Sequence, residues 1–426
     1  MKLFKSKYLW VITTIVLSIG YVFSCTKNDQ VVNPASLVTN ILTSIKTATS
    51  PAFIEQSKPG VAWDGNIDPA WNTAPKLTVT ATVPNPGNNT FPGFIGNSTE
   101  VTLRSMYDNQ YIYFLAEWDA PKVLQSEWWY FDPATKLWAQ EGVDPIFDAN
   151  GIMIRKPFVN DHFAMLWNIN NSTVDFPTKT CYASCHANTP SLNLDPVTGK
   201  ITTVNVPGSV MRTNNINEKL DQWHIWMIQS LNFNQGNDEY QGWAGGIENG
   251  DGMMSDDELP NATSGGANVQ TLTITGTSTQ VSVPIWVIPN KTNYNAILVS
   301  ETVNGTALQV TAVDNNGVLT LSNGSTIDPT SGTDYKQIGA GDGPKVIPGS
   351  IFGSYTGSFA DITCNAFYTG KGWRIQYKRL LKTADVLAQD VDFSGLNDQP
   401  FGIAAFFNHA DVQHAIKTNL VLKFKK

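Results

Sequence analysis

The sequence is short of charge, and the charge that it has is mainly acidic. Charged residues make up 15% of the 426 residues, below the typical quarter, and the formal net charge is −8. The chain has no run of basic residues of the kind that follows a phosphate backbone, so nucleic acid is excluded as a partner. The low charge, together with 33 Gly and 13 Trp, favours a β-rich protein that works outside the cytoplasm.

Long hydrophobic runs are missing too, except at the N-terminus. Lys2, Lys5 and Lys7 precede an apolar run from Tyr8 to Phe23, which is typical of an export signal. The run ends just before Cys25, in a sequence that resembles a bacterial lipobox. We therefore expect a lipid on Cys25 and a location in the cell envelope. An ordinary signal peptide or a short membrane anchor stays open as the alternative.

Composition divides the chain into segments. We predict a lipoprotein signal peptide at 1–24, a polar tether at 25–50 and a folded domain at 51–426. Within that domain, charges nearly vanish at 259–343, and Thr, Val, Asn and Gly dominate. We expect this stretch to form a small all-β insertion.

Hydrophobic alternation predicts an all-β fold. Val101–Tyr107 and Gln110–Trp118 flank a two-residue polar turn, which indicates a β-hairpin. Further strand-like runs are Leu77–Val83, His162–Asn168, Gln222–Ser230, Gly372–Leu380, Phe401–Phe407 and Leu420–Phe424. Many short strands separated by turn residues are typical of an immunoglobulin-like β-sandwich.

Two of the four cysteines lie within five residues of a histidine in the sequence. Cys181 and Cys185 enclose three residues, and His186 follows directly. This spacing is one residue longer than the usual C-x-x-C-H signal for covalent haem. Two thiols and an imidazole in six residues can hold a haem, bind a transition metal, or form a disulfide loop beside an unrelated histidine. The residues alone leave these three possibilities open.

Recognisable catalytic patterns are absent, since no convincing Ser-His-Asp, Walker or Rossmann pattern occurs. Trp128, Trp129 and Trp138 lie in a segment that is otherwise short of apolar residues. They could form a rim over a cofactor or a patch for a partner. We expect them instead to be core residues of an irregular loop.

Several short segments form an ordered pattern along the chain. They are Trp63-Asp64-Gly65 with Trp71, Tyr111–Asp119, Asp161–Trp167, Cys181–His186, Asp221–His224, Trp373–Leu380 and Phe401–Phe407. This pattern resembles the haem-binding domains related to the γ subunit of ethylbenzene dehydrogenase, the cytochrome c-552/DMSO reductase-like family. The resemblance covers roughly 60–258 and 346–426.

The resemblance implies an immunoglobulin-like or DOMON-like β-sandwich that carries one haem and passes electrons. In the b-type members, a methionine in the middle of the chain and a lysine near its end ligate the iron. Here the first position resembles Cys181–His186, and the second resembles a stretch that contains His409 and His414. Other members carry a C-x-x-x-C-H stretch at the first position. Ligation by two histidines is therefore the favoured inference.

On this resemblance, we expect Cys181 and Cys185 to attach the haem and His186 to ligate its iron. His414 ranks first as the second ligand, before His224, His409 and a methionine such as Met165 or Met227. Trp223 and Trp226 would pack on the ring. A c-type haem is favoured and a b-type haem is possible. Iron with two imidazole ligands has no open position, so we expect electron transfer rather than catalysis.

The sequence thus predicts a lipid-anchored electron-transfer protein on the periplasmic face or the outer surface. Its partner would be another cytochrome or a molybdenum oxidoreductase. The alternative is a β-sandwich surface lipoprotein that binds carbohydrate. That alternative requires Cys181 and Cys185 to form a structural disulfide.

Overall fold

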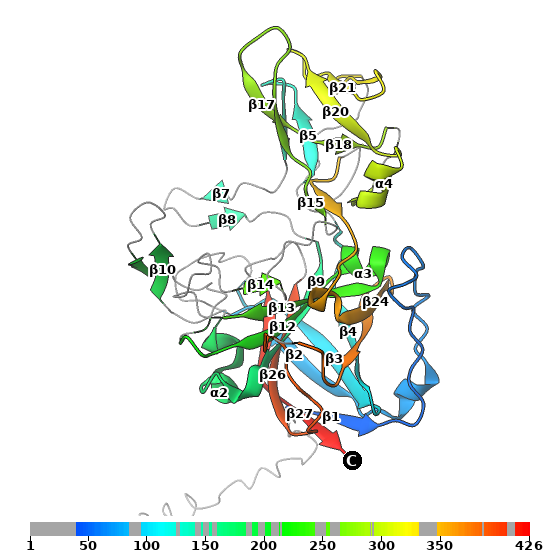
Figure 1. Cartoon of the computed structure of the whole chain (residues 1–426), viewed down its shortest axis with the longest axis vertical. Coiled ribbons are helices and arrows are strands. Elements are labelled where there is room, and N and C mark those ends of the chain that lie inside the picture. Colours follow the sequence, from blue (N-terminus) through cyan, green and yellow to red (C-terminus); the bar gives the residue numbers. More distant parts are fainter. Residues whose placement is uncertain are drawn as a thin grey trace, which may run out of the picture. The chain divides into compact units, whose positions relative to one another are not determined.

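The computed structural model describes most of the chain from Asn40 onward (Figure 1). The described residues are 40–84, 95–124, 128–140, 146–147, 153–155, 160–184, 190–194, 201–205, 213, 215–242, 253–255, 265–289, 291, 294–331, 347–385, 387–406 and 414–426. The predicted signal peptide lies outside them, as do Cys25, Cys185, His186 and His409. Among the described residues, no helix has the length and apolar character needed to span a bilayer.

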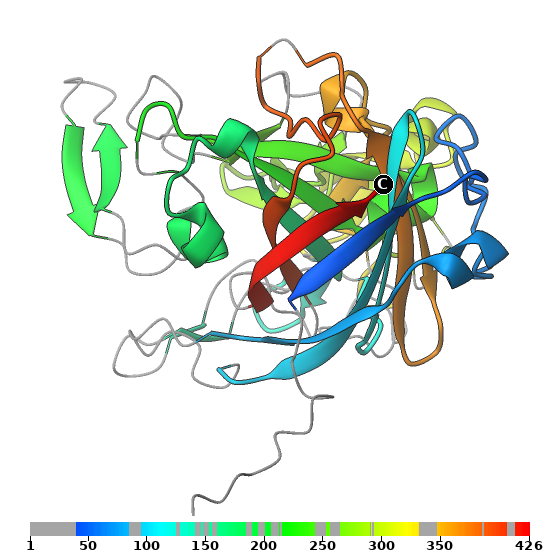
Figure 2. The same ribbon diagram turned by 90° about the horizontal axis from the view of Figure 1, so that it is seen from below.

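One large sheet contains twelve strands. They are β1 (Ile41–Lys46), β2 (Leu77–Thr82), β3 (Ser98–Tyr107), β4 (Tyr111–Asp119), β9 (His162–Asn168), β12 (Leu220–Trp226), β13 (Gln235–Gln241), β14 (Met253–Ser255), β24 (Ile362–Tyr368), β25 (Gly372–Leu380), β26 (Gln399–Phe406) and β27 (Ala415–Lys425). The order runs β27-β2-β3-β4-β25-β24-β13-β12-β9-β26, and β26 then pairs with β27. In Figure 2, β27 (red) runs beside β1 (blue), and the two strands pair in parallel.

The pairing confirms the all-β class and refines the expected architecture. An immunoglobulin-like sandwich consists of two separate sheets. Here the ladder of hydrogen bonds closes on itself through the β26–β27 pair, so that one continuous sheet surrounds the central core. The strand pairing therefore shows one continuous sheet and not the two separate sheets that the sequence predicted.

Local sequence explains most of these strands. The predicted hairpin is present as β3 and β4, and Asp108 closes its turn by accepting hydrogen bonds from the backbone N–H groups of Gln110 and Tyr111. The strand predicted at Gln222–Ser230 ends earlier, at Trp226, and α3 (Met227–Phe233) follows. Alternation alone did not reveal this change, because the first residues of α3 are buried as they would be in a strand.

Alternation along the strands assigns each residue to one of two faces. The inner faces form the central core, which includes Phe163, Met165 and Trp167 of β9 and Trp223 of β12. The opposite side of β9, β12 and β26 we call the outer face. It carries a second buried apolar cluster of Ala164, Leu166, Phe176, Cys181, Ala183, Leu220, Ala404, Phe406 and Ile416.

The predicted insertion contains several short strands with their own core. Its elements are β15 (Gly265–Ala267), β16 (Gln270–Thr273), β17 (Gln280–Val283), β18 (Trp286–Val287), β19 (Ile297–Leu298), α4 (Val299–Val303), β20 (Leu308–Val313), β21 (Leu319–Leu321) and β22 (Thr326–Ile327), with β23 (Ser350–Phe352) pairing to β15 and β19. The remaining elements are η2 (Pro69–Thr73), β5 (Trp129–Asp132), β6 (Leu137–Gln140), β7 (Ile146–Phe147), β8 (Met153–Arg155), η3 (Ile169–Asn171), α2 (Phe176–Lys179), η4 (Thr180–Ala183), β10 (Pro190–Leu194), β11 (Ile201–Asn205) and η5 (Ser358–Ala360).

Trp129 and Trp138, which lie between β4 and β9 in the sequence, belong to the core of this insertion. Trp129 and Trp138 pack in one buried cluster with residues of β17, β18, β20 and β21. The indole N–H of Trp129 donates to the carbonyl oxygen of Asn268 at 2.8 Å, and that of Trp138 donates to Gly317 at 2.7 Å. These two side chains are thus core residues, as expected, but they lie in the paired strands β5 and β6 and not in the irregular loop that the sequence predicted.

Candidate functional site

An aromatic row crosses the outer face of three strands. Trp226, His162 and Phe406 are register partners on β12, β9 and β26. The His162 ring stacks on both neighbours, with centroids 4.2 Å from Trp226 and 3.7 Å from Phe406. Its Nδ1 lies 2.8 Å from the carbonyl oxygen of Asn160. The ring centroid of His414, just before β27, lies 4.1 Å from that of Phe406, so His414 borders this row.

The next row on the outer face has small side chains beside a second imidazole. His224 is the register partner of Ala164, which in turn pairs with Ala404. Both alanines belong to the apolar cluster of this face. Small apolar side chains thus lie beside an imidazole whose ring centroid is 4.8 Å from that of Trp226 in the aromatic row.

Cys181 lies against the same face. It is 5% exposed and packs in the apolar cluster with Ala404 and Phe406. A Cβ atom added to Gly402 of β26 would lie 2.9 Å from its Sγ, so a larger residue there would require the Cys181 side chain to shift. The preceding Thr180 has a left-handed φ of 44°, an unusual conformation for a residue with a side chain. The fold thus brings Cys181 to the face that carries His224.

The imidazole of His224 is held from one side. It is 6% exposed, and its Nδ1 lies 3.2 Å from Oε2 of Glu239. Glu239 also accepts hydrogen bonds from the side-chain amides of Gln222 and Asn237, each at 3.1 Å. The Nε2 of His224 is buried and has no hydrogen-bond partner among the described residues. A carboxylate behind Nδ1 and an open Nε2 are typical of histidines that bind a metal.

Two other predicted site residues, Met165 and Trp223, lie on the inner face of the sheet and not on the outer face. Met165 is buried in the central core, where its sulfur accepts a hydrogen bond from the hydroxyl of Tyr377 at 2.7 Å. Trp223 is fully buried there as well, and the guanidinium of Arg379 lies 4.7 Å from its ring centroid. The structure therefore does not bring Met165 or Trp223 together with His224. Cys185 and His186 fall outside the described residues, so their placement stays a prediction.

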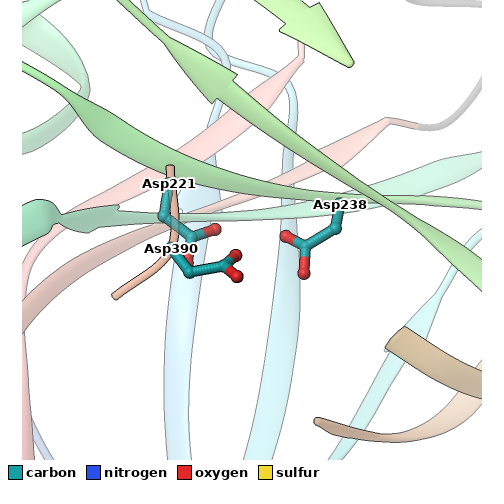
Figure 3. Close-up of side chains that lie close together, drawn as sticks. All are labelled: Asp221, Asp238 and Asp390. Atoms are coloured by element: carbon teal, nitrogen blue, oxygen red, sulfur yellow. The ribbon is translucent and has the colours of Figure 1, made fainter. Parts of the chain in front are cut away.

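A buried charge cluster lies on the inner side of the same strands. Figure 3 shows the carboxyl groups of Asp221, Asp238 and Asp390 close together. The Nη1 of Arg379 lies 2.7 Å from a carboxylate oxygen of Asp221, 3.1 Å from one of Asp238 and 2.7 Å from one of Asp390. Its Nη2 donates to the carbonyl oxygen of Val391 at 2.7 Å. Arg379 thus supplies the positive charge that these carboxylates need.

Burial and the neighbouring charges shift the pKa values of Asp221 and Arg379 in this cluster. Burial raises the pKa of Asp221, against the opposing effect of the Arg379 charge, while the three carboxylates raise the pKa of Arg379. One oxygen of Asp221, Oδ1, is buried without a hydrogen-bond partner among the described residues. Sequence reasoning missed the cluster. Its signal was the alternation of β25, which places Arg379 on the same face as the core residues Ile375 and Tyr377.

A second buried carboxyl group precedes the histidine of β9. Asp161 accepts hydrogen bonds from the indole N–H of Trp373 at 2.7 Å and from the backbone N–H of Val123 at 2.8 Å. Burial raises its pKa to about 7, although both hydrogen bonds oppose that shift. Asp161 and Trp373 come from two segments of the ordered pattern, and here they meet.

These segments lie within a region that matches one protein family. The model of the ethylbenzene dehydrogenase family matches residues 68–418. The chain belongs to that family. The expected resemblance is therefore confirmed at the level of the family, which is named for an oxidoreductase.

Further comparisons add little to the family assignment. No curated protein matches the chain. Two solved structures of a carbohydrate binding module family 9 from Caldicellulosiruptor kristjanssonii, one with cellotriose and one with glucose, are each 7% identical to it. They cover 90% of this chain and 93% and 95% of their own, each with a TM-score of 0.27. A score this low does not establish a common fold.

Proposed function

We propose that this member of the ethylbenzene dehydrogenase family binds one haem on its outer face and transfers electrons. The observation that carries the proposal is the meeting of Cys181 with the outer face that presents His224. These residues come from distant parts of the chain, yet both border the same apolar cluster. Family membership supports a role in oxidoreductase chemistry.

The residues present fit a haem. Cys181, with Cys185, would attach the group, and His186 would be the proximal ligand. A second imidazole would come from His224 or His414, both of which border the outer face. The haem would supply a one-electron couple, and the apolar cluster would keep water from it. Ligation by two imidazoles leaves no open position, so we propose an electron-transfer protein or accessory subunit rather than an enzyme.

The N-terminal sequence supports a location of this protein in the cell envelope. A lipid on Cys25 would anchor the protein to a membrane of the cell envelope, at the periplasmic face or the outer surface. The partner would be another cytochrome or a molybdenum oxidoreductase. The family name, an oxidoreductase, supports this class of partner.

A pyridine haemochrome spectrum tests the proposal. The full chain would be produced in cells with cytochrome-maturation machinery and measured before and after acid-acetone extraction. Haem that stays with the protein supports covalent attachment through the cysteines, and haem that extracts supports a b-type protein of the same function. Absence of haem in both samples would overturn the proposal and favour the carbohydrate-binding alternative.

Two cysteine variants sharpen this measurement. Cys181→Ala should lower the fraction of haem that resists extraction, because Cys181 lies at the outer face. Cys364→Ala is the matched control, since Cys364 is buried in the central core. An equal effect of both variants would argue against attachment at Cys181.

A further inference from the structure

We propose that His224 is the second axial ligand of the haem iron and that Glu239 is the residue that positions it. This inference rests on the proposed function and deepens it. It ranks His224 above His414, which the sequence favoured, and it gives a role to Glu239, which no sequence pattern indicated.

The hydrogen bonding of His224 leaves one nitrogen for a ligand. A carboxylate oxygen accepts a hydrogen bond from an imidazole N–H, so the contact between Glu239 and Nδ1 favours the tautomer of His224 that carries its proton on Nδ1. The lone pair is then on Nε2. A buried polar atom without a hydrogen-bond partner destabilises the folded state. Coordination of a metal by Nε2 would remove that destabilisation, which no contact among the described residues does.

The position of Glu239 is fixed by the chain itself. Its carboxylate is 7% exposed, and three side chains converge on it: the imidazole of His224 and the amides of Gln222 and Asn237. All four residues alternate on the same face of β12 and β13, where His224 is the register partner of Asn237 and Gln222 that of Glu239. This arrangement orients the ring and increases the basicity of Nε2 as a ligand.

A neighbouring histidine of this face, His162, is held differently. His162 faces a backbone carbonyl oxygen with its Nδ1, and its ring is stacked between Trp226 and Phe406. A neutral carbonyl makes a weaker hydrogen bond than a carboxylate. The His162 ring lies in the aromatic row beside His224, and the centroids of the two imidazoles are 4.6 Å apart.

The role of Glu239 has a measurable consequence. A carboxylate bonded to the ligand imidazole increases electron donation to the iron and so favours the oxidised state. Glu239→Gln removes the charge and keeps a side chain of similar size that can still accept from Nδ1. We expect this variant to keep two nitrogen ligands but to shift the one-electron equilibrium toward the reduced state by about tenfold, or roughly 59 mV.

The experiment compares the wild type with His224→Gln, Glu239→Gln and the control His414→Gln. Haem content is measured first, then the electron paramagnetic resonance spectrum of the oxidised protein, and then the midpoint potential. We expect His224→Gln to lose the low-spin signal and to bind carbon monoxide when reduced. We expect His414→Gln to keep the wild-type spectrum, and Glu239→Gln to change only the potential.

Each outcome supports or overturns a distinct part of the inference. A wild type without haem would overturn the proposed function itself. A haem-containing wild type whose low-spin signal survives in His224→Gln, or is lost in His414→Gln, would overturn the ligand assignment. An unchanged potential in Glu239→Gln would overturn the positioning role. If His224→Gln does not fold, His224→Gly with added imidazole replaces it, and the free imidazole should restore the low-spin signal.

Discussion

Two polar clusters lie on opposite faces of the same pair of strands. On the inner side, Asp221 of β12 and Asp238 of β13 contact Arg379. On the outer side, His224 of β12 contacts Glu239 of β13. Because successive residues of a strand point to opposite faces, Asp238 and Glu239 are neighbours in sequence and belong to different clusters.

The two clusters differ in how their charges are matched. The inner carboxylates meet a guanidinium from the chain itself, and the loop at Asp390 and Val391 covers it with further contacts. Both clusters contain buried polar atoms without a partner among the described residues: Oδ1 of Asp221 and Nε of Arg379 on the inner side, and Nε2 of His224 on the outer side. Of these atoms, the imidazole nitrogen of His224 is the common metal ligand. A buried group that the chain itself pairs stabilises the fold, whereas a positioned group with an open nitrogen is suited to a ligand.

The largest effect is expected at the centre of the inner cluster. Arg379→Met would leave three buried carboxylates without their cation, which costs about 3–5 kcal/mol of unfolding free energy. Denaturant unfolding of the haem-free protein measures this change. The control is Lys382→Ala, which breaks an exposed ion pair with Asp392 and should cost about 0–1 kcal/mol. A loss at Arg379 no larger than the control would show that the cluster does not stabilise the fold.

Asp161 and Asp221 should make the stability depend on pH. Burial raises the folded-state pKa of both above the ordinary value of 3.8, to about 7 for Asp161. The folded state therefore holds protons that the unfolded state has released, so stability falls as pH rises toward 7. Asp161 alone should contribute about 1.4 kcal/mol per pH unit between roughly pH 4 and 7.

Unfolding free energies measured across this pH range test the prediction, with Asp161→Asn as the matched variant. The asparagine oxygen can still accept from Trp373 and Val123 but does not titrate. We expect a shallower decline in this variant. Equal slopes of stability against pH for the wild type and the variant between pH 4 and 7 would contradict the raised pKa of Asp161.

The smallest effect on stability is expected at the outer cluster. His224→Gln keeps a hydrogen-bond donor for Glu239 and removes Nε2, which has no hydrogen-bond partner among the described residues. The unfolding free energy of the haem-free protein should therefore fall by less than about 1 kcal/mol. The same denaturant experiment measures it. A loss as large as that of Arg379→Met would mean that the outer cluster is structural and would remove the contrast between the two faces.

Much of this protein was determined by local sequence. Alternation in Val101–Trp118 and His162–Asn168 predicted β3, β4 and β9 because a strand with one buried face repeats every two residues. The segment at Cys181 was recognisable because its three chemical groups are close in sequence. The ordered motifs also indicated the family, which the match to residues 68–418 confirms.

Only the tertiary structure decided which distant residues meet. Arg379 reaches Asp221 across 158 positions, and Trp138 reaches Gly317 across 179. The closure of the sheet by β26 and β27, and the pairing of His224 with Glu239, likewise depend on strand register. Register is set by packing and turns throughout the fold, so one strand's sequence specifies its two faces but not its partners.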